Sequence, residues 1–140
     1  MNRPIVVGVD QSETARRAVL RAAEIASALN APLHLVMAAS PGRADGMATE
    51  TGHRVDWLAG AEQFLDSLSG ELSVSSVTHA VVADDPAAAM CDEAERVDAQ
   101  MIVVGNRRVQ GIARVLGAIA TDVARRASCD VLISDTTSDA

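Results

Sequence analysis

Residues 5–9 read Ile-Val-Val-Gly-Val, and residues 101–105 read Met-Ile-Val-Val-Gly. Both runs are continuously apolar and rich in β-branched residues, without the alternation of a strand that has one face in water. This pattern is typical of strands in a parallel sheet, because helices cover such a sheet on both faces. We therefore predict that these two runs are central strands.

Three further runs rich in β-branched residues are predicted to complete the sheet. In chain order the five predicted strands are 5–9, 33–38, 77–83, 101–104 and 131–133, with helical patterns between them. Right-handed crossovers turn this alternation into an α/β fold, a single doubly wound five-stranded parallel sheet of strand order 3-2-1-4-5 with helices on both faces. Because 140 residues are too few for two ordinary domains, residues 1–140 are predicted to form one domain.

Local signals predict where the helices begin and end. Ser12 is a predicted N-cap of the first helix, and Asn30 ends that helix because asparagine tolerates left-handed backbone geometry. Pro86 opens the third helix at a position where proline is tolerated. The fourth helix is predicted from near Gly117 to about Ala127.

The segment 40–52 carries a proline and three glycines and is predicted to be a mobile loop of lid-like length. The second helix follows it and is predicted to end near Gly70.

The charge and the cysteines exclude several classes of function. A net charge of −7 argues against a nucleic-acid partner, although a small anion can still find a positive pocket among the arginines. Cys91 and Cys129 lack the close spacing of a redox or zinc pair, and the three histidines lack ligand spacing, so no metal site is predicted. No secretory or membrane-spanning segment is recognised, and we expect a cytoplasmic protein without a membrane partner.

The predicted topology also predicts a binding crevice. In doubly wound sheets, ligands bind beyond the carboxyl ends of the strands where the strand order reverses. Here that point lies between the first and fourth strands. These strands end in Gly8-Val9-Asp10 and in residues 104–108, Val-Gly-Asn-Arg-Arg, and the second segment leads towards Gly117.

Residues 7–15, Val-Gly-Val-Asp-Gln-Ser-Glu-Thr-Ala, resemble the opening of universal stress proteins, in which an aspartate closes the first strand. Asp85-Pro86-Ala87, the segment 105–117 and residues 126–133 follow the order and spacing of that family, so the resemblance covers almost the entire chain. It implies a Rossmann-like, adenine nucleotide alpha hydrolase-like fold. It also implies a small regulatory module in the stress response that binds ATP, AMP or cyclic AMP, with Mg²⁺ if the ligand is a triphosphate.

ATP-binding members of the family carry a loop of the form Gly, two residues, Gly, nine residues, Gly, then Ser or Thr. This chain keeps Gly105 and Gly117, but Arg108 replaces the second glycine, the following spacing is one residue shorter, and Ala118 replaces the hydroxyl residue. Loss of a hydroxyl that bonds a charged phosphate costs roughly 1.5 to 3 kcal/mol. Arg108 either grips a phosphate with two hydrogen bonds or fills its place.

The resemblance places the adenosine near Asp10 and Ala38. The full set of nucleotide-binding residues that it implies is Gly8, Val9, Asp10, Ala38, Val104, Gly105, Arg107, Arg108, Gly117, Ala118 and Ile119. Three of these have structural alternatives: an Asx turn or helix cap for Asp10, a tight turn with positive φ for Gly105, and close packing at a helix start for Gly117.

A second function remains open, that of a nucleotide-independent dimeric interaction protein with a degenerate phosphate loop. No residue for water activation is recognised, so at most weak ATP hydrolysis is expected. The resemblance implies a homodimer that pairs through the last strand at Val131, Leu132 and Ile133. Alternatively, Asp130, Asp135 and the polar tail protect this edge.

Overall fold

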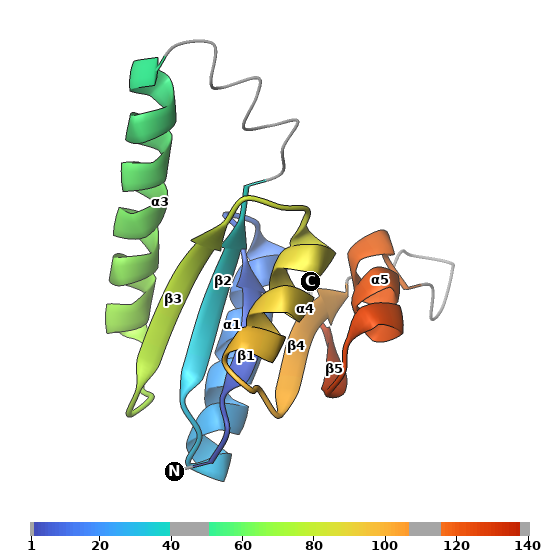
Figure 1. Ribbon diagram of the computed structural model, residues 1–140. Helices are drawn as coiled ribbons and strands as arrows, with labels where there is room; N and C mark the ends of the chain where they lie inside the picture. The colour runs from blue at the N-terminus through green and yellow to red at the C-terminus, as the bar shows by residue number, and fades with distance from the viewer. Residues whose placement is uncertain (1, 40–50, 107–115, 138–140) are drawn as a thin grey trace.

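The computed structural model describes residues 2–39, 51–106 and 116–137. Five parallel strands form one sheet in the order β3-β2-β1-β4-β5, as predicted (Figure 1). The strands are β1 (Ile5–Val9), β2 (Leu33–Ala38), β3 (Val77–Val82), β4 (Met101–Asn106) and β5 (Asp130–Asp135). β4 and β5 are longer than predicted, because both continue their shared ladder to the pair of Asn106 and Asp135.

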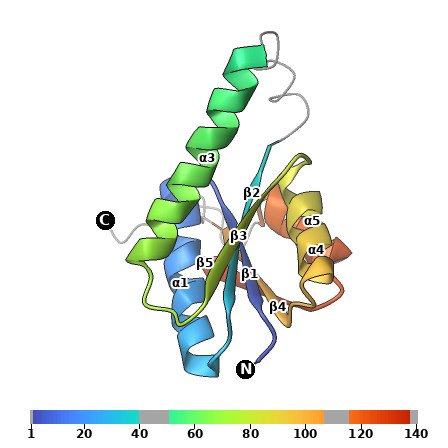
Figure 2. The same ribbon diagram turned by 60° about the vertical axis from the view of Figure 1, so that its left-hand side comes forward.

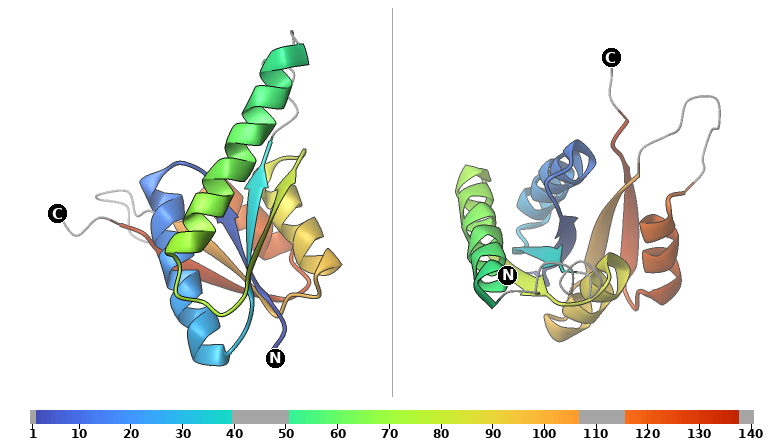
Figure 3. Two further views of the ribbon diagram at one scale, coloured as in Figure 1. Left: turned by 90° about the vertical axis from the view of Figure 1, so that its left-hand side faces the viewer. Right: turned by 90° about the horizontal axis from the view of Figure 1, so that it is seen from above.

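Helices cover both faces of the sheet. They are α1 (Glu13–Leu29), α3 (Thr51–Glu71), α4 (Pro86–Arg96) and α5 (Ala118–Arg126). Figure 2 shows α1 and α3 on one face and α4 and α5 on the other, and the view from above in Figure 3 shows the same layers.

Each face of the sheet has its own apolar core. On β1, Val7 belongs to the core under α1 and α3, and its neighbour Val6 belongs to the core under α4 and α5. On β4, Val103 and Ile102 divide in the same way. Because successive side chains of a strand point to opposite faces, burial on both faces requires the continuous apolar runs that the central strands carry.

The predicted helix ends are confirmed for α1 and α4. The Ser12 hydroxyl accepts a hydrogen bond from the Ala15 amide at 3.1 Å, and Asn30 closes α1 with φ of 51°. Pro86 stands in the first turn of α4, which Asp85 caps by accepting from the Ala88 amide at 3.0 Å. These contacts satisfy backbone groups that helix termini leave without partners.

The predicted loop 40–52 extends two residues too far, because α3 begins at Thr51; its remainder, 40–50, lies outside the described residues.

Two kinds of feature are absent from the described part of the chain. No three His, Cys, Asp or Glu side chains gather closely enough there to hold a metal ion. None of the helices in these residues is both long enough and apolar enough to cross a bilayer.

Candidate functional site

The crevice lies where the chain leaves the two central strands in opposite directions. From β1 the chain passes through α1 to β2, and from β4 it reaches β5 through α5, on the other face of the sheet. The connections that follow β1 and β4 therefore diverge to opposite faces of the sheet. This is the geometry that opens a ligand crevice in doubly wound sheets.

A cavity of about 170 Å³ occupies this position. The predicted site residues that line it are Gly8, Val9, Asp10, Ala38, Val104, Gly105 and Ile119. Residues from β1, β2, β4 and α5, far apart in the sequence, thus meet around one space. The structure brings together seven of the eleven residues predicted to bind a nucleotide, and their role in binding stays a prediction.

The remaining predicted residues do not line this cavity. Gly117 and Ala118 stand at the start of α5, in the same turn as the lining residue Ile119. Arg107 and Arg108 lie outside the described residues, so their predicted contacts with phosphate stay predictions.

Several lining residues were not predicted. They are Ser12, Thr14, Ala15, Ala18, Val36, Pro86 and Met90. The lining residues at the start of α1 could have been predicted, because the sequence already indicates that this helix begins just after Asp10. Pro86 and Met90 come from α4, and no local pattern shows that this helix reaches the end of β1.

Gly8 explains how α4 comes so close. A Cβ atom added at Gly8 would lie 2.7 Å from the Met90 sulfur, which is closer than carbon and sulfur atoms pack. The absence of a side chain at Gly8 therefore lets Met90 lie directly on the β1 backbone. This contact forms part of the cavity wall, since both residues line it.

Asp10 adopts the structural alternative foreseen for it. Its Oδ1 accepts a hydrogen bond from the Ser12 amide at 2.6 Å, which makes an Asx turn ahead of α1. The side chain of Ser12 in turn caps the helix. Asp10 is exposed at the rim of the cavity, where the turn fixes the direction of its carboxylate.

The structural alternative considered for Gly105, a tight turn with positive φ, is wrong. Gly105 lies inside β4, and its φ is outside the left-handed region. An added Cβ would lie 3.0 Å from Cγ2 of Thr136 and 3.1 Å from the carbonyl oxygen of Thr14. Glycine is needed here because α1 and Thr136, the residue after β5, both approach the β4 backbone closely.

The structural alternative considered for Gly117, close packing at a helix start, is also wrong. An added Cβ would meet Oδ1 of Asn106 at 3.5 Å, an ordinary contact. Gly117 is the N-cap of α5, with φ of −66° and ψ of 165°. Its amide donates a hydrogen bond of 2.7 Å to Oδ1 of Asn106, the last residue of β4.

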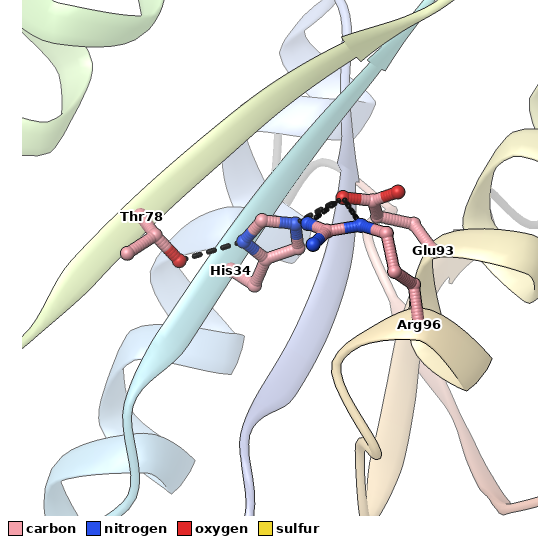
Figure 4. A network of polar contacts seen from close by, with 4 residues as sticks. All are labelled: His34, Thr78, Glu93 and Arg96. Carbon is pink, nitrogen blue, oxygen red and sulfur yellow. Dashed lines mark hydrogen bonds and ion pairs between the residues drawn. The ribbon is translucent and has the colours of Figure 1, made fainter.

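A polar network around two buried residues, His34 and Glu93, fixes α4 on the sheet (Figure 4). The residue His34 on β2 is 3% exposed. Its ring Nδ1 lies 2.6 Å from the Thr78 hydroxyl, and its Nε2 lies 2.9 Å from Oε1 of Glu93. Arg96 also donates to that carboxylate oxygen. The hydrogen bond from Arg96 is the main cause that lowers the pKa of Glu93, against the opposing effect of burial. The network joins β2, β3 and the helix that carries Met90.

The two cysteines are packed as apolar residues. Cys91 on α4 belongs to the core under α4 and α5, and Cys129 packs against that core. Desolvation is the main cause that raises the pKa of each thiol. Neither thiol is therefore activated as a nucleophile.

The sheet order and the crevice at its reversal point define a doubly wound α/β protein with a small-molecule cavity. The model of the universal stress protein family matches residues 1–134. A universal stress protein of Mycobacterium tuberculosis is 33% identical over 143 residues, covering 96% of this chain and 97% of the relative. The chain therefore belongs to the universal stress protein family.

Two solved structures of the family carry nucleotides. A universal stress protein in complex with cAMP is 29% identical, with a TM-score of 0.70 over 96% of this chain and 97% of its own. A universal stress protein from Archaeoglobus fulgidus in complex with dAMP is 25% identical, with a TM-score of 0.66 over 94% of this chain and 97% of its own.

Proposed function

We propose that residues 1–140 act as one regulatory domain that binds an adenine nucleotide, ATP, AMP or cyclic AMP, in the crevice between β1 and β4. The observation that carries this proposal is the cavity at the reversal point, lined by residues predicted for that role. The similarity to structures in complex with cAMP and dAMP supports the same class of ligand.

The chemistry of the cavity fits the parts of such a ligand. Val36, Ala38 and Val104 give apolar surface for a base, and the Asp10 carboxylate at the rim can accept hydrogen bonds from ribose hydroxyls. We place the phosphates towards Gly105, Gly117 and Arg108. Mg²⁺ would accompany a triphosphate and offset its charge.

Calorimetric titration tests this proposal. Protein freed of co-purified nucleotide is titrated with ATP, AMP and cyclic AMP. Micromolar binding of any of them supports a nucleotide-responsive module. No heat of binding up to millimolar ligand, with the fold verified by circular dichroism, would exclude it.

A specific observation favours a second candidate, a dimeric interaction protein that works without nucleotide. The amide of Gly117 already has an acceptor in Asn106, and Ala118 offers no hydroxyl. Both features reduce the number of donors for phosphate at the start of α5. The titration distinguishes the two candidates, since only the first requires a bound nucleotide.

Other parts of the proposal follow from charge and topology. We infer a cytoplasmic protein with at most weak ATP hydrolysis and no nucleic-acid partner, because a net charge of −7 opposes binding to a polyphosphate. We also infer a homodimer that pairs through β5. Within residues 2–39, 51–106 and 116–137, this strand has a hydrogen-bonded neighbour on one side only, and Ile133 on it is 37% exposed.

A further inference from the structure

The cavity in the crevice has one wall from β2 and one from α4. Val36 and Ala38 of β2 line it, and so do Pro86 and Met90 of α4. Side chains alternate between the two faces of a strand, so His34 lies on the same face of β2 as Val36 and Ala38. The wall on β2 therefore continues directly into His34.

Glu93 stands in the same relation to the wall on α4. It follows Met90 by three residues, so the two side chains lie on one face of the helix, about one turn apart. Nε2 of His34 lies 2.9 Å from Oε1 of Glu93, and both residues are buried (Figure 4). This contact therefore joins the two walls one helical turn beyond the lining residue Met90.

The buried face of α4 is otherwise built largely from small residues. Four of its seven buried residues are alanines, namely Ala87, Ala88, Ala89 and Ala94. Helices take their position from side chains that pack into grooves, and methyl groups make shallow ridges that define this position weakly. Met90 packs against Gly8, but a methionine side chain is flexible and adapts to a shift of its helix. The bond between Glu93 and His34 is directional and tolerates such a shift less well.

Stability alone does not account for a carboxylate that is buried in this way. Replacing buried, hydrogen-bonded polar groups by well-packed apolar side chains is often neutral or stabilising, because the polar groups lose their contact with water on folding. The attested use of such groups is to select one arrangement among several that pack equally well. On the smooth face of α4, the arrangement to be selected is the place of the helix on the sheet.

We propose that His34 and Glu93 are a positioning pair, which fixes α4 at the place on the sheet where Pro86 and Met90 form the wall of the nucleotide cavity. This inference rests on the proposed function for the ligand. It deepens that function by assigning the shape of the cavity to two residues that do not line it.

The test replaces the pair by apolar side chains of similar volume, in the double variant His34→Leu with Glu93→Leu. The free energy of unfolding in urea should equal or exceed that of the wild type. Calorimetry should nevertheless show about tenfold weaker binding of AMP or cyclic AMP, a loss usual for residues that act on a site through others. Retained stability with lost affinity distinguishes positioning from a merely structural role.

NMR of the ligand-free protein reports the position of α4 directly. The methyl groups of the methionines are labelled with ¹³C, and the signal of Met90 is assigned by its absence in Met90→Leu. In the double variant this signal should shift or broaden, because α4 then takes up more than one position on the sheet.

Two single variants separate the reach of the Glu93 side chain from its charge. Glu93→Gln keeps an oxygen acceptor for His34 at the same reach, so the affinity and the Met90 signal at pH 7 should remain those of the wild type. Glu93→Asp keeps the charge but is one methylene shorter, so it should weaken binding and shift the Met90 signal.

Leu65→Ala is the matched control. Leu65 is fully buried in the core on the other face of the sheet and does not line the cavity. The substitution should lower the free energy of unfolding, because it leaves a void in that core. The Met90 signal and the affinity of the folded protein should not change.

The outcomes separate this inference from the proposed function. Wild-type protein that binds no nucleotide overturns the proposed function, and the Met90 signal of the ligand-free protein still tests the pair. An unchanged Met90 signal in the double variant overturns the positioning role. If the double variant does not fold, an unchanged signal in Glu93→Asp overturns it instead. A loss of affinity in Leu65→Ala as large as in the double variant would also contradict it.

Discussion

At the scale of single residues, glycines shape the crevice by letting other elements approach. On one face of the sheet, Met90 of α4 packs closely against Gly8. On the other face, α1 and Thr136 pack closely against Gly105. Neither glycine is required by a positive φ. Their roles follow from contacts with residues that are distant in the sequence, so a substitution is expected to cost packing energy.

We predict that Gly105→Ala destabilises the fold by about 1 to 3 kcal/mol, the usual cost of overpacking. The added methyl group would be 3.1 Å from the Thr14 carbonyl oxygen, a backbone atom that cannot rotate away. The destabilisation is measured as the decrease in the free energy of unfolding, determined by urea denaturation. Gly60→Ala is the matched control: nothing lies within 4 Å of its added Cβ, and this helical position should gain roughly 0.8 to 1 kcal/mol. Equal effects at both glycines would refute the packing argument.

At the scale of elements, the network of His34, Thr78, Glu93 and Arg96 holds α4 against β2 and β3 (Figure 4). Glu93 is 7% exposed, yet its pKa is lowered because Arg96 and His34 bond its carboxylate. A carboxyl whose pKa is lowered on folding stabilises the folded state above its ordinary pKa. That contribution is lost as the pH falls through the folded-state pKa.

We therefore predict that the wild-type protein loses more stability than Glu93→Gln does as the pH is lowered from 7 to 3. Urea unfolding at a series of pH values measures how steeply the free energy of unfolding of each protein falls with pH. Glu95→Gln, at an exposed position on the same helix, is the control and should follow the wild type. Parallel curves for the wild type and Glu93→Gln would show that the buried carboxylate does not contribute in this way.

At the scale of the whole molecule, β5 is one of the two edge strands of the sheet, and in the described part of the chain it pairs with β4 alone. The edge offers backbone groups to a second copy, and Val131, Leu132 and Ile133 give it apolar side chains that are half-buried or exposed. Open edges of this kind favour strand pairing unless charges protect them. Asp130 and Asp135 place a negative charge at each end of the strand, and these charges oppose its pairing with a second copy.

We predict that the purified protein is a dimer in light scattering and that Ile133→Glu converts it to a monomer with an unchanged circular dichroism spectrum. The substitution places a charge at the proposed interface, where its burial is unfavourable. Leu58→Glu is the matched control, since Leu58 is 46% exposed on α3, beside β3 at the other end of the sheet. A dimer that persists in Ile133→Glu would contradict pairing through β5.

The sequence by itself determined the five strands, their order, the cap at Ser12, the proline in the first turn of α4 and the position of the crevice. These features follow from local chemistry: apolar periodicity, turn residues and the handedness of crossovers act within a few residues or within one unit of the chain. The family resemblance added the residues around the cavity, and seven of them line it.

Only the tertiary structure decided which distant groups meet. Four contacts join residues that no short pattern relates. They are the contacts of Met90 with Gly8, Thr136 with Gly105, Glu93 with His34 and Asn106 with Gly117. Their contacts depend on how helices settle on the sheet, which packing of the whole core determines. The course of the strands could therefore be predicted from local sequence, whereas the reason for each glycine and the bond that holds the Gly117 amide could not.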